Sequence, residues 1–165
     1  MINYLKKFNL ESKTAFVVGG LGLIGKEVSM SLATAGAKVV MLDIDKKAAK
    51  ILIRNSKEDS HNLNFEFFNC SDMDLIEKNY FKIISKYGCP DVFINCSYPR
   101  TDDWSIGSFE DISLNTFRKN VDIHMNSFIW LSRLTAESMK KEKINGSIIQ
   151  LGSIYGILGQ DLTVY

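Results

Sequence analysis

A short apolar run that leads into three regularly spaced glycines constrains this chain more than any other feature. Residues 16–18 are followed by Gly19, Gly22 and Gly25, and a helical pattern begins at Leu23. This pattern predicts a strand, a tight turn and a helix start. Such a turn can hold a dinucleotide pyrophosphate, because Gly19 permits the reversal, Gly22 lets the backbone approach phosphate and Gly25 lets the helix pack closely. The helix N-terminus then faces an anion.

A carboxylate follows where a dinucleotide site needs one. Residues 38–43 form a second apolar run, and it ends in Asp43. An acid there accepts hydrogen bonds from ribose hydroxyls and repels a 2′-phosphate, so the sequence predicts NAD, with NADP disfavoured. The alternative is a glycine-rich turn and a solvated aspartate beside a helix start. The order strand, turn, helix, strand and acid favours the nucleotide site.

Apolar runs and helical patterns alternate along the rest of the chain. Further strands are expected at residues 64–69, 91–96 and 147–152, and helices at residues 23–35, 45–57, 72–86 and 114–143. In the first helix, Ile24, Val28 and Leu32 form the apolar stripe. This order predicts an α/β fold, a Rossmann-like doubly wound parallel sheet of five strands with flanking helices, in a single domain over residues 1–165.

The loop at residues 97–112 is long and polar, and it contains Pro99, Arg100 and Trp104. Loops of this length inside a compact domain are often functional.

Composition excludes several classes of function. The net charge of +1 provides no basic field for nucleic acid, and no apolar run is long enough to cross a bilayer. Cys70, Cys89 and Cys96 lack the spacing of zinc ligands, so no metal site is expected. Reduced thiols and the lack of a secretory signal in residues 1–13 predict a cytoplasmic protein.

Several segments together resemble the short-chain dehydrogenase/reductase family over about residues 9–155. The glycine turn is similar to the family's GxxGxxG motif, and Asp43 matches the acid that favours NAD. Residues 69–72 resemble the segment whose first residue contacts adenine, and residues 95–97 resemble the start of an Asn-Asn-Ala-Gly motif, from which Cys96 departs. The resemblance implies these cofactor-binding residues: Gly19, Gly22, Leu23, Ile24, Gly25, Asp43, Asn69, Cys70, Asn95, Cys96 and Ser97.

The catalytic residues of the family are matched only in part. Residues 146–156 resemble the strand that delivers a catalytic serine, here Ser153, and His124 stands where the family has a catalytic asparagine. His124 is either a substitute for that asparagine or a satisfied core residue. The family's proton donor is a tyrosine with a lysine four residues later, and no tyrosine here has one. Tyr165 is near the expected place but is the last residue.

This partial match leaves three hypotheses about the function. The motifs most resemble a branch linked to flagellin modification and surface-sugar synthesis, which implies a sugar or nucleotide-sugar substrate. The leading hypothesis is an NAD-dependent oxidoreductase represented by its cofactor-binding part. The alternatives are a dinucleotide-binding module without activity and a partial reading frame.

The resemblance also predicts self-association. The family's sheet has the strand order 3-2-1-4-5-6-7, so a chain that ends after strand five leaves residues 147–152 as an unpaired edge. The same loss is expected to expose Ile123, Trp130 and Leu134 on the long helix. We therefore expect a homo-oligomer formed through residues 114–143, through the strand edge or through both.

Overall fold

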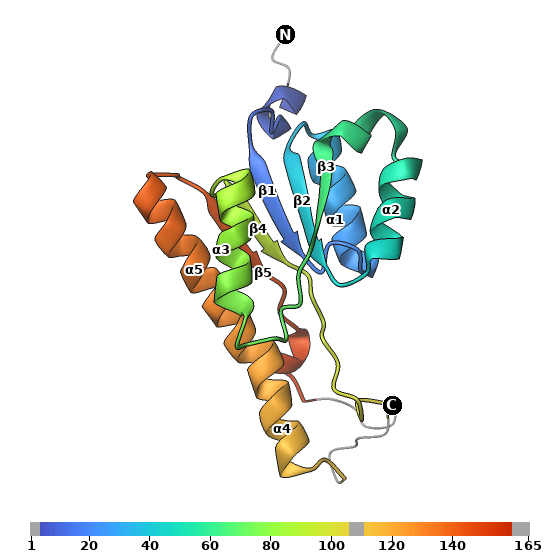
Figure 1. Ribbon diagram of the computed structural model, residues 1–165, viewed down its shortest axis with the longest axis vertical. Helices are drawn as coiled ribbons and strands as arrows, with labels where there is room; N and C mark the ends of the chain where they lie inside the picture. Colours follow the sequence, from blue (N-terminus) through green and yellow to red (C-terminus); the bar gives the residue numbers. More distant parts are fainter. Residues whose placement is uncertain (1–3, 106–110, 160–165) are drawn as a thin grey trace.

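Five parallel strands form one sheet in the order β3-β2-β1-β4-β5, as the sequence predicts (Figure 1). The computed structural model describes residues 4–105 and 111–159. The strands are β1 (Thr14–Val18), β2 (Lys38–Asp43), β3 (Leu63–Phe67), β4 (Val92–Asn95) and β5 (Ser147–Gln150). The apolar runs of β1, β2 and β4 are buried because helices cover both faces of the sheet.

Helices cover the sheet in two layers (Figure 1). One layer holds α1 (Leu23–Thr34) and α2 (Lys46–Asn55), and the other holds α3 (Ile76–Tyr87) and α5 (Ser127–Glu142). The helix α4 (Leu114–Val121) extends the line of α5 beyond the end of the sheet. Short helical turns complete the described chain: η1 (Tyr4–Phe8), η2 (Lys57–Asn62), η3 (Asp122–Asn126) and η4 (Ile154–Gly156).

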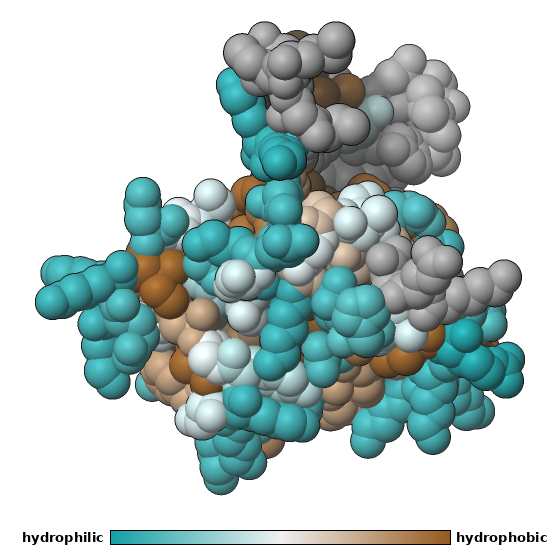
Figure 2. Space-filling view, turned by 90° about the horizontal axis from the view of Figure 1, so that it is seen from above, coloured by the Kyte–Doolittle hydropathy of each residue, from teal (hydrophilic) through white to brown (hydrophobic). Residues whose placement is uncertain are grey.

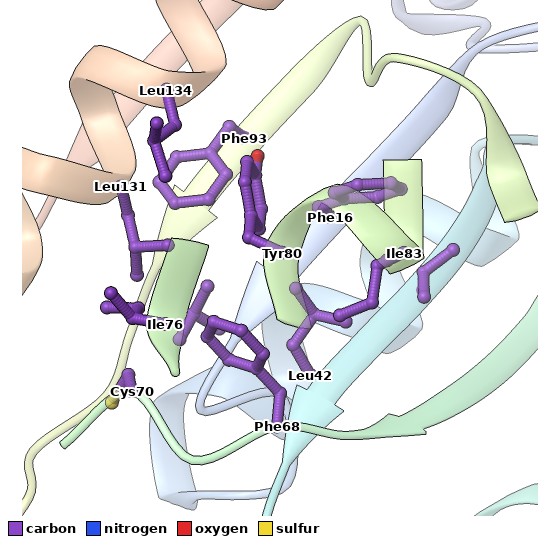
Figure 3. Packing of buried hydrophobic residues seen from close by; sticks show 12 residues of the cluster. Phe16, Leu42, Phe68, Cys70, Ile76, Tyr80, Ile83, Phe93, Leu131 and Leu134 are labelled. Carbon is purple, nitrogen blue, oxygen red and sulfur yellow. The ribbon is translucent and has the colours of Figure 1, made fainter. Parts of the chain in front are cut away.

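The core between the sheet and the layer of α3 and α5 is built around aromatic rings (Figure 3). The ring of Tyr80 on α3 packs edge-on against Phe16 of β1 and Phe93 of β4, with centroids 6.1 and 6.0 Å apart. Its hydroxyl lies 2.6 Å from the hydroxyl of Thr135 on α5. Tyr80 therefore joins two helices and two strands while its polar atom remains hydrogen-bonded.

The buried face of α1 differs from the predicted stripe. Its buried residues are the small Gly25, Ser29 and Ala33, whereas Ile24 is exposed and Val28 is only partly buried. The prediction is wrong for Ile24 but not for Val28 and Leu32, which are partly buried and pack against the core. Small residues let the helix axis approach the sheet closely, and a hydrophobicity pattern does not register that.

Three local predictions also need correction. The helix α3 begins at Ile76 and not at residue 72, because Asp72 instead closes a turn by accepting from the backbone N–H of Leu75. The helix predicted at residues 45–57 ends at Asn55, and the 3₁₀ turn η2 follows it. The long helix exists, but η3 interrupts it with one π-helical turn. Such turns recur at functional sites.

The surface contradicts one expectation about the long helix. Ile123 and Leu134 are buried, whereas the exposed apolar residues of this helix include Leu114, Phe117, Met125 and Ile129. The packing of α3 and the sheet against α5 explains the burial of Leu134. The face seen in Figure 2 is mostly hydrophilic, with hydrophobic residues in small separate patches. Among the described residues, no helix is long and apolar enough to cross a membrane.

Candidate functional site

A cavity of about 580 Å³ lies at the carboxyl ends of the strands, toward the lower edge of the sheet in Figure 1. It is lined by residues 18, 19, 21–24, 42–45, 68–71 and 96–100. The strand order reverses direction between β1 and β4 at this edge, and ligands of open α/β sheets bind at such points. Except for Gly25 and Asn95, the sequence-predicted cofactor residues therefore line one cavity.

Two glycines of the turn are required by the fold itself. Gly19 has φ +69°, and a Cβ there would lie 2.6 Å from the backbone of Ser97. A Cβ on Gly25 would overlap the carbonyl oxygen of Gly19. Gly25 does not line the cavity, so it acts by letting α1 pack against the turn.

Gly22 lines the cavity and is different from these two. Its φ of −67° suits any residue, and a Cβ would meet only the carbonyl oxygen of Gly19, at an ordinary 3.4 Å. The fold therefore does not demand glycine here. A ligand that approaches the backbone does demand it, because a side chain would fill part of the cavity.

The N-terminus of α1 opens into the same cavity. Gly22 is the N-cap and its residue type provides no capping side chain, so the first backbone N–H groups of the helix lack that partner. Leu23 and Ile24 line the cavity with side chains that are 94% and 59% exposed. N–H groups without a side-chain cap, together with the helix dipole, suit an anion at this position.

Asp43 is the last residue of β2, and its side chain contacts the glycine turn. Its Oδ2 accepts a 3.0 Å hydrogen bond from the backbone N–H of Leu21, and its Oδ1 accepts a 2.7 Å bond from that of Ile44. The carboxylate thus borders the cavity and fixes the turn. Its lone pairs suit ribose hydroxyls, as predicted from the sequence.

Asn69 and two thiols line the wall between the ends of β3 and β4. The Oδ1 of Asn69 accepts from the backbone N–H of Ser71, which fixes this side chain in a tight turn. Burial raises the pKa of the Cys70 thiol, which is also hydrogen-bonded to Ser97, and burial raises that of Cys96. Both cysteines are neutral wall residues near pH 7, not reactive thiolates.

Asn95 lies behind the cavity wall. It is fully buried and is not a lining residue, and its Oδ1 accepts from both the backbone N–H and the hydroxyl of Ser97, at 3.0 and 2.6 Å. Asn95 therefore shapes the wall through Ser97, which does line the cavity. Its own contact with a cofactor stays a prediction.

Two of the predicted catalytic residues, Ser153 and His124, do not line this cavity. Ser153 is exposed and its hydroxyl accepts from the backbone N–H of Tyr155, so it caps η4. His124 lies on the π-helical turn η3, with its ring 5.1 Å from that of Tyr98 and 6.0 Å from that of Phe128. No hydrogen bond joins His124 to Ser153 among the described residues, and Tyr165 lies outside them.

The environment of His124 combines burial with a specific partner. Burial lowers the pKa of its imidazole, and a hydrogen bond to the backbone carbonyl of Pro99 partly opposes this shift. The neutral imidazole is therefore favoured at pH 7. A neutral imidazole suits the positioning of a neighbouring group by hydrogen bonds.

The lining residues that sequence reasoning did not assign to the site include Asp45, Tyr98 and Arg100. Asp45 caps α2 by accepting from the backbone N–H groups of Lys47 and Ala48, and that capping pattern was its only sequence signal. Tyr98 and Arg100 follow β4 in the long loop. Only the folded structure shows that this loop returns to the cavity.

Comparisons with known proteins agree with this architecture. The family model described as short chain dehydrogenase matches residues 13–165. The post-translational flagellin modification protein A of Campylobacter coli is 27% identical over 160 residues, covering 94% of this chain and 61% of that protein. The 7alpha-hydroxysteroid dehydrogenase of Escherichia coli K12 is 32% identical over 145 residues, covering 85% of this chain and 52% of that protein.

A solved structure shares the fold over the whole chain. A short chain dehydrogenase from Leptospira borgpetersenii with bound NAD+ superposes with a TM-score of 0.80 at 23% identity, covering 100% of this chain and 60% of that chain. This chain therefore spans about three fifths of that structure, and 52–61% of the two curated relatives.

Proposed function

Because the chain belongs to the short-chain dehydrogenase/reductase family, we propose that it forms the NAD-binding part of an oxidoreductase. The nicotinamide cofactor supplies hydride transfer to or from a carbonyl or alcohol carbon. The residues of this chain bind and orient the dinucleotide along the cavity at the carboxyl ends of the strands.

The observation that carries this proposal is the space beside Gly22. A Cβ there would meet only the carbonyl oxygen of Gly19, at 3.4 Å, and Gly22 lines the cavity together with the start of α1 and Asp43. The first N–H groups of α1 fit a pyrophosphate, and the carboxylate fits ribose hydroxyls.

Asp43 supports a preference for NAD over NADP. Its carboxylate and that of Asp45 both line the cavity. A 2′-phosphate bound beside them would meet like charges in a partly desolvated space, which is unfavourable. The NAD+ bound to the Leptospira borgpetersenii relative supports the cofactor class.

We assign contact with the substrate to Ser153 and His124. The Ser153 hydroxyl can hold a substrate oxygen, and the neutral His124 can position a neighbouring group or a water molecule. This pair lacks a tyrosine with a nearby lysine, so proton transfer at the substrate oxygen has no group of matched pKa.

The substrate class that we propose is a sugar or a nucleotide-sugar. Its support is the similarity to the flagellin modification protein of Campylobacter coli, together with the shared sequence motifs. We place the reaction in the cytoplasm, and the three free cysteines are compatible with that compartment.

A dinucleotide-binding module without enzymatic activity is the second candidate. The positions of Ser153 and His124 outside the cavity favour it. Both candidates require the dinucleotide, so cofactor binding tests what they share and turnover separates them.

We also propose that copies of the chain associate with one another. The support is the exposed apolar side of the long helix, where Phe117 and Ile129 are 55% and 60% exposed. The edge of β5 adds to it, because β5 pairs only with β4 in the described sheet and carries the exposed Ile149.

Calorimetric titration of the chain with NAD and with NADP tests the proposed function. Saturable binding of one NAD per chain, with weaker NADP binding, is the expected result. Failure of both dinucleotides to bind would remove the proposal, and stronger NADP binding would remove Asp43 from its role.

A further inference from the structure

The loop that follows β4 brings a cation to the cavity. Tyr98, Pro99 and Arg100 line it, and among the residues that the structure describes Arg100 is the only lysine, arginine or histidine that does so. The two carboxylates of the cavity, Asp43 and Asp45, belong to the end of β2 and the turn after it. The cavity therefore has acidic groups from one segment and a basic group from another.

Aromatic contacts hold Arg100 in place. Its guanidinium carbon lies 4.1 Å from the centre of the Trp104 ring, and that ring packs edge-on against Tyr98 with centroids 6.2 Å apart. A guanidinium stacked on an indole keeps its N–H groups in the ring plane free for a ligand. The side chain is thus partly preorganised, which reduces the entropy lost on binding.

Contacts with the long helix fix the loop itself. The Tyr98 ring lies 5.1 Å from that of His124, and the backbone carbonyl of Pro99 accepts a hydrogen bond from the His124 imidazole. Arg100 is the next residue after Pro99. Arg100 therefore lines the cavity from a loop whose two preceding residues contact His124 on η3.

Arg100 lacks an internal counter-charge in the described part of the chain. None of the ion pairs found there involves it. An exposed guanidinium with fixed orientation and free N–H groups fits the two oxygens of a carboxylate or phosphate. The pyrophosphate of the dinucleotide already has the α1 N-terminus, so the anion for Arg100 comes from another molecule.

We propose that Arg100 determines substrate specificity by binding a carboxylate or phosphate group of the substrate. This inference rests on the proposed function, because it places the substrate next to a bound dinucleotide. It narrows the substrate class from sugars in general to sugars that carry an anionic group.

The test uses amide and side-chain NMR signals of the whole chain, titrated with glucuronate, glucose 1-phosphate and neutral glucose, each with and without saturating NAD. The two anions distinguish a carboxylate from a phosphate ligand. The variants are Arg100→Gln, which removes the charge, and Arg100→Lys, which keeps the charge but lacks the paired N–H donors of the guanidinium. Arg133→Gln is the matched control, because Arg133 stacks on Trp130 at 4.6 Å and does not line the cavity.

At least one anion is expected to bind about tenfold more tightly than glucose and to shift the Trp104 indole signal. Arg100→Gln should remove this difference, Arg100→Lys should retain part of it, and Arg133→Gln should leave it unchanged. Equal binding of glucose and both anions would overturn the proposal. An Arg100→Gln variant that loses NAD affinity as strongly as anion affinity would instead assign Arg100 to the cofactor. Failure of NAD to bind the wild type counts against the proposed function alone, since the anions are also titrated without NAD.

Discussion

The carboxylate of Asp43 holds the backbone N–H of Leu21 at 3.0 Å, so the end of β2 is tied directly to the glycine turn. One side chain therefore has two tasks in the proposed function, since it fixes the glycine turn and is assigned to the ribose of the dinucleotide. Substitutions can separate these tasks because asparagine keeps an acceptor oxygen and loses the charge.

Asp43→Asn is expected to reduce the preference for NAD over NADP severalfold and to cost less stability than Asp43→Ala, because it keeps one of the two oxygens that accept from the N–H groups of Leu21 and Ile44. Asp43→Ala should also lower the free energy of unfolding by about 1 kcal/mol, since the N–H of Leu21 loses its acceptor. Calorimetry with both cofactors and urea unfolding measure the two effects. An asparagine variant with the full NAD preference would show that the charge is not the selecting feature.

Asp91 gives the fold a defined pH dependence. Burial acts to raise the pKa of its carboxyl, but hydrogen bonds from the Thr14 backbone and from Lys13, each 2.9 Å, outweigh burial and leave the pKa below its ordinary value. Its stabilising contribution is therefore present above the unfolded-state pKa of about 4 and is lost as pH falls through the folded-state pKa.

Urea unfolding of the wild type and of Asp91→Asn from pH 7 to pH 3 measures this contribution. The wild type should be the more stable protein at pH 7, and the difference should shrink below about pH 4. A difference that stays constant over this range would mean that the Asp91 charge does not contribute.

Most of the fold could be predicted because it depends on local patterns. The apolar runs that became β1 and β2 are too short for helices and are bounded by glycine or charged residues, and the glycine turn fixes the start of α1 directly after β1. The fully buried strands then require helices on both faces. These local features determine the order of elements and the parallel class of the sheet.

The predictions failed where the outcome depends on contacts between distant segments. No local pattern marks the extra residue that makes η3 a π-helical turn. The burial of Gly25 in place of Ile24 depends on how closely α1 approaches β1, and the position of Arg100 depends on the contact of its loop with His124. Family resemblance located Ser153 but could not show that it caps η4 outside the cavity.

The 165 residues alone are expected to show no appreciable dehydrogenase turnover. Ser153 can hold a substrate oxygen, but no tyrosine has a lysine four residues later to supply a group of suitable pKa. NADH formation from a panel of sugars and nucleotide-sugars measures this. Turnover that disappears in Ser153→Ala would contradict the expectation and would identify His124 or Tyr165 as the substitute acid.

Self-association is expected to depend on the exposed apolar side of the long helix. Phe117→Glu combined with Ile129→Glu should weaken association at least about tenfold, because each charge would have to be desolvated in the interface. The fold should persist, since both side chains are mainly exposed. Sedimentation over a range of concentrations measures the strength of self-association. Lys141→Glu, at an exposed position of the same helix, is the control. A wild type that remains a compact monomer at high concentration would rule out this interface.

Gly22→Val is expected to weaken NAD binding at least about tenfold while the free energy of unfolding changes by no more than about 1 kcal/mol. A Cβ at Gly22 makes only an ordinary contact within the fold, and we expect the valine side chain to occupy space that the pyrophosphate needs. Gly152→Val is the control, because a Cβ there meets no atom within 4 Å and Gly152 does not line the cavity. Equal NAD affinity in the two variants would show that the backbone of Gly22 is not approached by the ligand.

The most direct measurement is an NMR titration of the isotope-labelled chain with NAD, in which each backbone amide reports its own surroundings. Binding of the dinucleotide along the cavity predicts the largest shifts at the amides of Leu23 and Ile24 and at those around Asp43. NAD that binds and leaves these amides unchanged, with its shifts gathered on another surface, would contradict the placement of the cofactor in this cavity.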